Sequence, residues 1–282
     1  MKHAGKWLIA ASALVILGAG LFAAVMAAND WNLSRLSTEE FETNTYEIRE
    51  DFSRIDLTVE TADILFALSD DGGCRVVCRE LAEAKHSVSV QNGALTVTAK
   101  DQRKWYEHIG INLESPRVTV YLPGPDYASL RITGSTGSIT VPAGFSFGRM
   151  DLSLSTGDIR LCGLSAGELD LTVSTGDVDI ESVSCGSLTT TGSTGDITLK
   201  NVITKGTLTV KRSTGDVRLE ACDAGELTLE TSTGSVTGSL LSAKIFLAHS
   251  NTGDVDVPDT ATGGKCKIST STGDIRITLV KK

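Results

Sequence analysis

The stretch Ser155-Thr156-Gly157-Asp158-Ile159 decides the fold of this chain, because close copies of it recur seven more times. Each copy reads Ser or Asn, then Thr-Gly, then Asp or Ser, then Ile or Val. The glycines of successive copies are 19 or 20 residues apart. A period this regular indicates stacked structural repeats. The repeat glycines are Gly137, Gly157, Gly176, Gly195, Gly215, Gly234, Gly253 and Gly273.

Apolar residues keep fixed positions relative to these glycines. An Ile or Val stands two residues after every repeat glycine, and an apolar residue stands four residues after all but one, where Gly238 interrupts the row. A second stretch in each unit alternates apolar and polar residues, as at Leu169/Leu171 and Ile245/Leu247. Because alternate residues of a strand face the same side, these positions predict columns of inward-facing side chains.

One coil of this length buries too few side chains to offset the entropy lost when its backbone becomes ordered, so each coil needs neighbours. We therefore expect an all-β fold, a single-stranded β-solenoid (β-helix) with rungs of 19 or 20 residues, preceded by one N-terminal transmembrane helix. Residues 134–282 form the regular repeats in this interpretation. Residues 51–133 form an irregular entry and capping part, as terminal repeats often do.

Within the entry part, Asn92-Gly93 lies between two alternating stretches and predicts a β-hairpin. Further on, Trp105, Tyr106 and His108 belong to the one aromatic cluster outside the N-terminal apolar segment. Exposed aromatic side chains anchor binding partners, so this segment is a possible partner-binding loop. The alternative is a loop folded back over the core.

The composition excludes one class of partner. The chain has 282 residues, 26 Lys and Arg, 35 Asp and Glu, and a formal net charge of −9. Nucleic-acid binding depends on basic patches that neutralise phosphates. This acidic balance therefore argues against a nucleic-acid partner.

An uncharged run covers residues 7–28, after Lys2 and Lys6. It is long enough to span a hydrocarbon core of about 30 Å as a helix. The preceding lysines place the N-terminus in the cytoplasm and the rest of the chain outside. We expect an uncleaved, single-pass anchor over residues 1–28, and a cleaved signal peptide is the alternative. Residues 29–50 have no clear strand period and predict a juxtamembrane tether, with a short helix from Ser37 as the other possibility.

Several stretches of the chain together resemble a known family. The run Val118-Thr119-Val120-Tyr121-Leu122-Pro123, the later Leu130-Arg131-Ile132 and the repeated Ser-Thr-Gly-Asp turns are similar to the DUF4097 family. The resemblance covers roughly residues 50–280 and implies a β-solenoid of the adhesin-like proteins of the bacterial envelope. It also implies tethering to the membrane and, in some members, an association with envelope stress. It supplies no catalytic residues.

An aspartate follows six of the eight repeat glycines, so the stack should carry a column of carboxylates about 4.8 Å apart. Carboxylates that close repel one another unless water or cations intervene. Arg160, Arg218 and Arg276 follow two residues later and lie on the same face. Turn-capping aspartates with interleaved arginines are therefore the simplest interpretation. A calcium site is the functional alternative, at the carboxylate pairs Asp177/Asp179 and Asp254/Asp256.

The remaining chemistry-bearing residues point to no enzyme. The six cysteines and four histidines show no zinc or nucleophile spacing, and no cofactor motif is present. We therefore expect a non-catalytic binding or scaffold protein of the cell envelope, whose partner is an envelope protein or a glycan. The alternatives are self-assembly through an open C-terminal rung at Ile275–Leu279 and a polysaccharide-acting β-helix enzyme.

Overall fold

A computed structural model of the chain describes residues 4–31, 41–101 and 115–280. The chain divides into two compact units, one containing the helix and the other, Glu42–Asp101 and Ser115–Lys282, containing almost all of the β-structure. Helix α1 (Ala4–Ala28) carries one charged residue, Lys6, and is otherwise apolar on all sides; its segment Ala11–Ala28 has a mean hydropathy of 2.2. This helix is long and apolar enough to cross a membrane.

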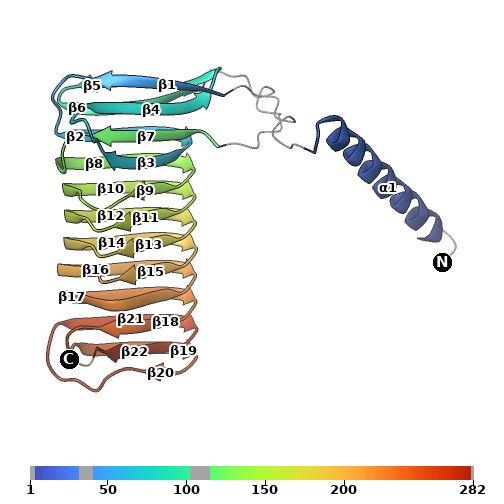
Figure 1. Ribbon diagram of the computed structural model, residues 1–282. Coiled ribbons are helices and arrows are strands. Elements are labelled where there is room, and N and C mark those ends of the chain that lie inside the picture. Colours follow the sequence, from blue (N-terminus) through green and yellow to red (C-terminus); the bar gives the residue numbers. More distant parts are fainter. Residues whose placement is uncertain (1–3, 32–40, 102–114, 281–282) are drawn as a thin grey trace. The chain divides into compact units, whose positions relative to one another are not determined.

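The second unit is the predicted β-solenoid, a stack of rungs in which each rung is one turn of the chain (Figure 1). Neighbouring rungs pair as parallel strands in register, 19 or 20 residues apart. The strands of the central rungs are β8 (Asp126–Thr136), β9 (Ile139–Val141), β10 (Ser146–Thr156), β11 (Ile159–Cys162), β12 (Ser165–Thr175), β13 (Val178–Glu181), β14 (Ser184–Thr194), β15 (Ile197–Lys200), β16 (Ile203–Thr214) and β17 (Val217–Thr233).

The core is a set of aliphatic columns that run along the stack. Ile159, Val178, Ile197 and Val217 lie above one another as register partners, and each is fully buried. Each polar residue between two inward positions faces outward. The predicted columns behind the repeat glycines are therefore confirmed.

Each rung turns at its repeat glycine, and the turn excludes any other residue. Gly195 has φ = +125°, and a Cβ built on it would lie 2.1 Å from the carbonyl oxygen of Gly176 in the neighbouring rung. Side chains rarely adopt this backbone conformation, and no Cβ fits at that distance. All eight repeat glycines have positive φ and the same close backbone contact, which explains why every repeat has glycine at this position.

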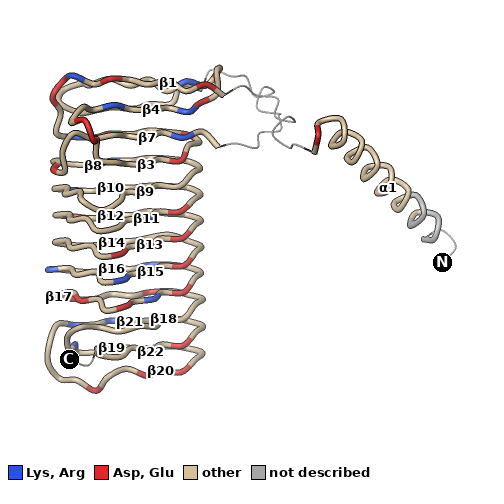
Figure 2. The backbone as a smooth tube through the Cα atoms, viewed as in Figure 1, with Lys and Arg blue, Asp and Glu red and all other residues tan. Residues whose placement is uncertain are grey.

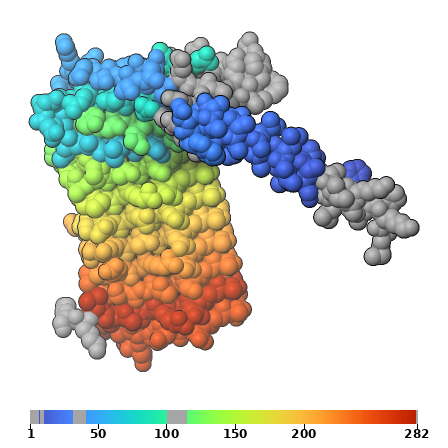
Figure 3. Space-filling model, turned by 45° about the vertical axis from the view of Figure 1, so that its right-hand side comes forward, coloured from blue at the N-terminus to red at the C-terminus, as the bar shows by residue number. Residues whose placement is uncertain are grey.

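The last two rungs are stacked out of sequence order. The C-terminal half of β17 pairs with β21 (Lys265–Thr272), and β21 pairs in turn with β19 (Ile245–Thr252). Likewise β22 (Ile275–Leu279) lies between β18 (Val236–Leu240) and β20 (Val255–Asp256). In Figure 3 the dark red C-terminal coil crosses the stack above orange-red segments that precede it in sequence. The coil 265–279 is thus inserted between its two predecessors.

This insertion corrects two predictions. The C-terminal rung does not form the open end of the stack, because the rung 245–256 lies beyond it. Ile245 and Leu247 do not face inward either, since they are 41% and 58% exposed, while Phe246 and Ala248 stack on Cys266 and Ile268. Whether a side chain faces inward depends on how many residues separate it from the repeat glycine that follows. Phe246 and Ala248 precede Gly253 by the same numbers of residues as the buried Cys266 and Ile268 precede Gly273.

The N-terminal end also departs from sequence order. The rung of β2 (Arg54–Thr61) and β3 (Asp63–Leu68) lies between β8–β9 and the rung of β6 (Ala94–Asp101) and β7 (Arg117–Leu122). Antiparallel strands β4 (Cys74–Leu81) and β5 (Ala84–Gln91) then pair with β7 and β6.

Two details of this end bear on the sequence-based expectations. Asn92 and Gly93, both with positive φ, join β5 to β6 as the predicted hairpin. Strand β1 (Phe41–Ile48) pairs with β4. The tether predicted over residues 29–50 is therefore wrong for residues 41–48, which form a strand of the cap.

Candidate functional site

The aspartates that follow the repeat glycines line one edge of the stack, where Figure 2 shows a column of acidic positions. Their side chains form a hydrogen-bonded ladder from rung to rung. The Oδ1 atoms of Asp158, Asp177 and Asp196 accept the backbone N–H of the residue at the same position of the next rung, at 3.1, 2.8 and 2.9 Å. The carboxylates therefore cap backbone N–H groups, as expected, but the capped groups belong to the neighbouring rung. Such caps hold successive turns together.

At both ends of the stack, the ladder joins rungs that are neighbours in space but not in sequence. Ser235 Oγ accepts the backbone N–H of Asp274 at 3.2 Å, and Asp274 Oδ1 accepts that of Asp254 at 2.9 Å. At the other end, Asp63 Oδ1 accepts the backbone N–H of Ser138 at 2.9 Å. The ladder thus includes both inserted rungs.

Arginines compensate the charge of the ladder. Arg218 bridges Asp196 and Asp216, with both N–O distances at 2.7 Å, and Arg160 lies 2.8 Å from Asp158. The hydrogen bond from Arg218, followed by that from the backbone of Asp216, lowers the pKa of Asp196. Asp196 therefore stays ionised and paired with Arg218 at neutral pH.

The calcium candidates lie on this ladder. Asp177 is exposed and already caps Asp196, while Asp179 is half-buried, and burial is the main reason why its pKa is raised. Asp254 and Asp256 are exposed on the outermost rung. Within the described ranges, neither pair belongs to a cluster of three His, Cys, Asp or Glu ligand atoms that lie within 4.8 Å of one another. A calcium site at these residues stays a prediction. The other predicted site, the partner-binding loop of Trp105, Tyr106 and His108, lies outside the described residues.

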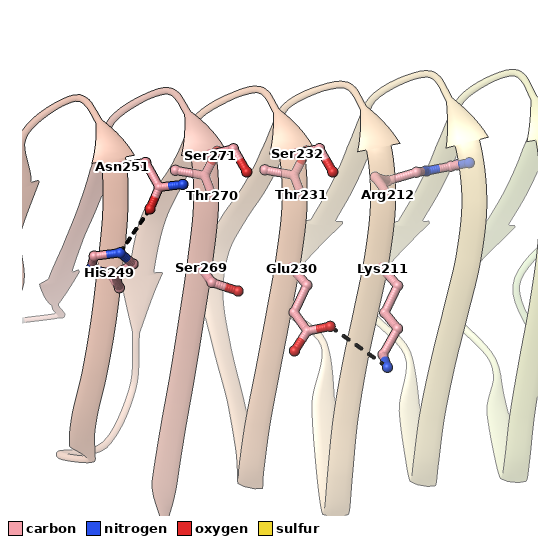
Figure 4. Close-up of a pocket in the computed structure, with 10 residues that line it drawn as sticks. All are labelled: Lys211, Arg212, Glu230, Thr231, Ser232, His249, Asn251, Ser269, Thr270 and Ser271. Carbon is pink, nitrogen blue, oxygen red and sulfur yellow. Dashed lines mark hydrogen bonds and ion pairs between the residues drawn. The ribbon is translucent and has the colours of Figure 1, made fainter.

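A polar depression of about 460 Å³ opens on the face formed by β16, β17, β21 and β19 (Figure 4). Its floor carries one outward residue from each of four rungs: Lys211, Glu230, Ser269 and His249. Because the coil 265–279 is inserted, the small Ser269 separates Glu230 from His249. The depression is lined by Lys211, Arg212, Glu230, Thr231, Ser232, His249, Asn251, Ser269, Thr270 and Ser271.

The charged groups of this depression are paired with one another. Glu230 lies 2.7 Å from Lys267 Nζ and 3.6 Å from Lys211 Nζ, and the hydrogen bond from Lys267 is the main reason why its pKa is lowered. His249 Nε2 lies 2.9 Å from Asn251 Oδ1. The surface therefore offers a cation, a carboxylate, an imidazole and several hydroxyls to a polar ligand.

Sequence reasoning missed Arg212, which lies at the rim of the depression. Its side chain is 5% exposed and crosses Gly192 of the neighbouring rung to donate to Val173 O at 2.7 Å and Gly176 O at 3.3 Å. In the next rungs, Thr231 and Thr270 occupy the same position and donate to a repeat-glycine carbonyl at 3.1 and 2.9 Å. The sequence does contain a signal for these contacts, because a polar residue stands three places before the repeat glycine in each of these rungs.

Known proteins with a similar sequence or structure were compared with this chain. Among curated proteins, none matches the sequence. A structure from Bacteroides fragilis NCTC 9343 described as a "putative adhesin" is 14% identical, with 86% of this chain and 98% of that chain covered and a TM-score of 0.49. A "putative lipid binding protein" from Parabacteroides distasonis ATCC 8503 is 18% identical, with 87% and 98% covered and a TM-score of 0.41.

A family comparison accounts for nearly all of the β-structure. The model of the family described as Toastrack DUF4097 matches residues 52–207 and again residues 185–282. Together these matches cover every solenoid rung, including both inserted ones. The chain therefore belongs to the Toastrack DUF4097 family.

Proposed function

We propose that this protein is a membrane-anchored, extracytoplasmic β-solenoid that binds a component of the cell envelope without catalysis, as an adhesin-like or stress-associated scaffold. The observation that carries the proposal is the pairing of an apolar 25-residue helix with a rigid, acidic stack of rungs in one chain. Lys2 and Lys6 precede the uncharged run of the helix, which favours a cytoplasmic N-terminus and an external solenoid.

The polar depression around Glu230 is the binding surface that we favour. Its outward side chains are held by parallel strands, so a ligand would meet a preformed array and lose little binding energy to protein ordering. Hydroxyls, an amide and paired charges suit the hydroxyl groups of a glycan or the polar surface of an envelope protein. Glu230 is ionised and shared between two lysines, which suits binding better than proton transfer.

The test is cross-linking on intact cells that express the full chain. We expect the solenoid to be accessible to external protease, to stay in the membrane fraction, and to cross-link to one main envelope component. Lys211→Ala should weaken that cross-link, whereas the matched control Lys200→Ala, which breaks the ion pair with Glu181 on another face, should not. An inaccessible solenoid, or equal loss in both variants, would contradict the proposal, and released glycan fragments would point to the enzyme alternative.

Self-assembly is the second candidate, favoured by the outermost rung. Ile245, Leu247 and Val255 are 41%, 58% and 44% exposed there, and β19 pairs with β21 on one edge only among the described residues. An exposed apolar edge strand is a template for pairing with a second copy. Sedimentation of the full chain should then show concentration-dependent association that Leu247→Lys abolishes. Ile203→Lys, at an exposed apolar site in the middle of the stack, is the control, and a monomer at all concentrations dismisses this candidate.

A further inference from the structure

Three potential metal ligands meet inside the N-terminal cap. Cys78 and Glu80 are alternate residues of β4 and face inward together with Cys74 and Val76, while His86 enters from β5. Cys78 and Glu80 are fully buried, and His86 is 6% exposed. One ligand atom from each of Cys78, Glu80 and His86 lies within 4.8 Å of the other two.

Glu80 is the centre of this buried cluster. One carboxylate oxygen, Oε2, accepts the backbone N–H of His86 and faces His86 Nδ1, both at 2.6 Å, and Oε1 accepts Asn44 Nδ2 at 2.8 Å. The geometry therefore holds the imidazole ring firmly against a carboxylate. Carboxylates in this arrangement orient histidines that bind metal ions.

The other ring nitrogen of His86 carries the second observation. Nε2 is buried and has no hydrogen-bond partner in the part of the chain that the structure describes. Buried polar atoms nearly always have a partner, and an exception calls for an explanation such as an ion. A hydrogen-bonded histidine alone would leave this atom unexplained.

We propose that Cys78, Glu80 and His86 bind a zinc ion inside the cap of the solenoid. A thiolate, a carboxylate and an imidazole are the ligand types that Zn²⁺ takes in proteins. On binding, the Cys78 S–H bond breaks, an S–Zn bond forms, and one proton goes to solvent. The neutral ring of His86 binds through Nε2, the nitrogen that has no partner, while Nδ1 keeps the ring proton and donates it to Glu80 Oε2.

The charge balance supports this ion. Zn²⁺ with one thiolate, one carboxylate and one neutral imidazole has a net charge of zero, which a fully buried site requires. Ca²⁺ and Mg²⁺ prefer sets of oxygen ligands, so the sulfur and nitrogen of this cluster select against them. A tetrahedral zinc ion holds its ligand atoms roughly 3–4 Å apart, so small side-chain rotations from the present positions suffice.

The site would stabilise the cap. It would tie β4 to β5, and Asn44 would connect it to β1, where the antiparallel strands close the end of the stack. A structural ion there would hold together the part of the solenoid that has no parallel rung above it. No step of chemistry is assigned to it.

The test uses the full chain in detergent after removal of metal with a chelator. We expect one equivalent of Zn²⁺ to bind and to raise the thermal unfolding midpoint, and one equivalent of Co²⁺ to give a thiolate-to-cobalt charge-transfer band. X-ray absorption of the zinc-loaded wild-type protein should show one sulfur ligand at about 2.3 Å among nitrogen and oxygen ligands at about 2.0–2.2 Å. A bound zinc without a sulfur neighbour, or no stoichiometric binding, would overturn the proposal and leave only a hydrogen-bonded Glu–His pair.

Two variants test the proposed ligands, and two further variants are their matched controls. Cys78→Ser and His86→Gln should each weaken Zn²⁺ binding by about 100-fold or more, and Cys78→Ser should also remove the cobalt band. Cys266→Ser, at another buried thiol, and His249→Gln, on the surface, should leave both readouts unchanged. Equal binding by all four variants would overturn the proposal. If a variant fails to fold, X-ray absorption of the wild-type protein decides.

Discussion

Replacing Gly195 with alanine tests whether the repeat glycines are required for stacking. Gly195 has φ = +125°, so the variant must either keep a strained backbone or change its turn. Residues held in such regions cost about 1–3 kcal/mol each. The new Cβ would also lie 2.1 Å from Gly176 O and 2.5 Å from Gly176 C, where no atoms can remain.

The contact can be relieved only if the two rungs move apart by about 1 Å or more. That movement strains the hydrogen bonds that join these two rungs, from Gly176 N to Thr194 O, at 2.9 Å, and from Val178 N to Asp196 O, at 3.0 Å. Losing these two bonds costs about 1–3 kcal/mol. Together with the backbone strain, we expect Gly195→Ala to lower the free energy of unfolding by about 2–6 kcal/mol.

The assay is urea unfolding of the full chain in detergent, followed by the β-sheet signal in far-ultraviolet circular dichroism. Gly72→Ala is the matched control for backbone strain alone, because Gly72 has φ = +72° and open space around it, and we expect a loss of about 1 kcal/mol. Gly124→Ala has open space and no positive φ, and it should be neutral. If Gly195→Ala costs no more than Gly72→Ala, the close contact between rungs does not limit the sequence and the reasoning is wrong.

Three further perturbations test other features. The pKa of Asp71 is lowered to about 2, first by its hydrogen bond from Ser69, and that of Asp196 is also lowered, so both groups favour the folded state above their unfolded pKa near 4. Stability measured by urea unfolding should therefore fall between about pH 4 and pH 2, and a flat profile there would contradict the assignment. Gly192→Ala should expel the buried Arg212, because the new Cβ would lie 1.8 Å from its Nη1; faster hydrogen exchange in β14 and β16 would show this, and unchanged exchange would refute it. Deleting residues 259–282 should remove the partner of β19 and free one edge of the C-terminal half of β17, which still pairs with β16, so hydrogen exchange should rise in both strands; loss of protection in β19 alone would mean that the rungs stack in sequence order.

The sequence predicts the regular part of the fold well because one physical constraint repeats. A positive-φ glycine fixes each turn, and counting from it gives the inward positions of each rung. The same regularity hides the order of the end rungs, since strand β17 finds suitable apolar partners in either β19 or β21. The error at Ile245 and Leu247 came from following hydrophobicity where the count from Gly253 pointed to Phe246 and Ala248.

The candidate sites were less predictable than the fold. The depression depends on the insertion that places Ser269 between Glu230 and His249, which no local pattern reveals. The buried cluster did leave a signal, because Cys74, Val76, Cys78 and Glu80 alternate along β4 and put a carboxylate at an inward position. A charged residue in an inward row should have prompted a search for its partner.

The insertion of the C-terminal coil has a consequence for synthesis and breakdown. Residues 245–256 leave the ribosome before residues 265–279, yet they can find their native neighbour only after the later segment has arrived. The growing chain must therefore hold this outer segment unpaired until residues 265–279 have been synthesised, or pair it wrongly and release it. Once the coil is in place, a protease finds no free edge at the start of β22, because Ile275 and Arg276 pair with β18 on one side and with β20 on the other.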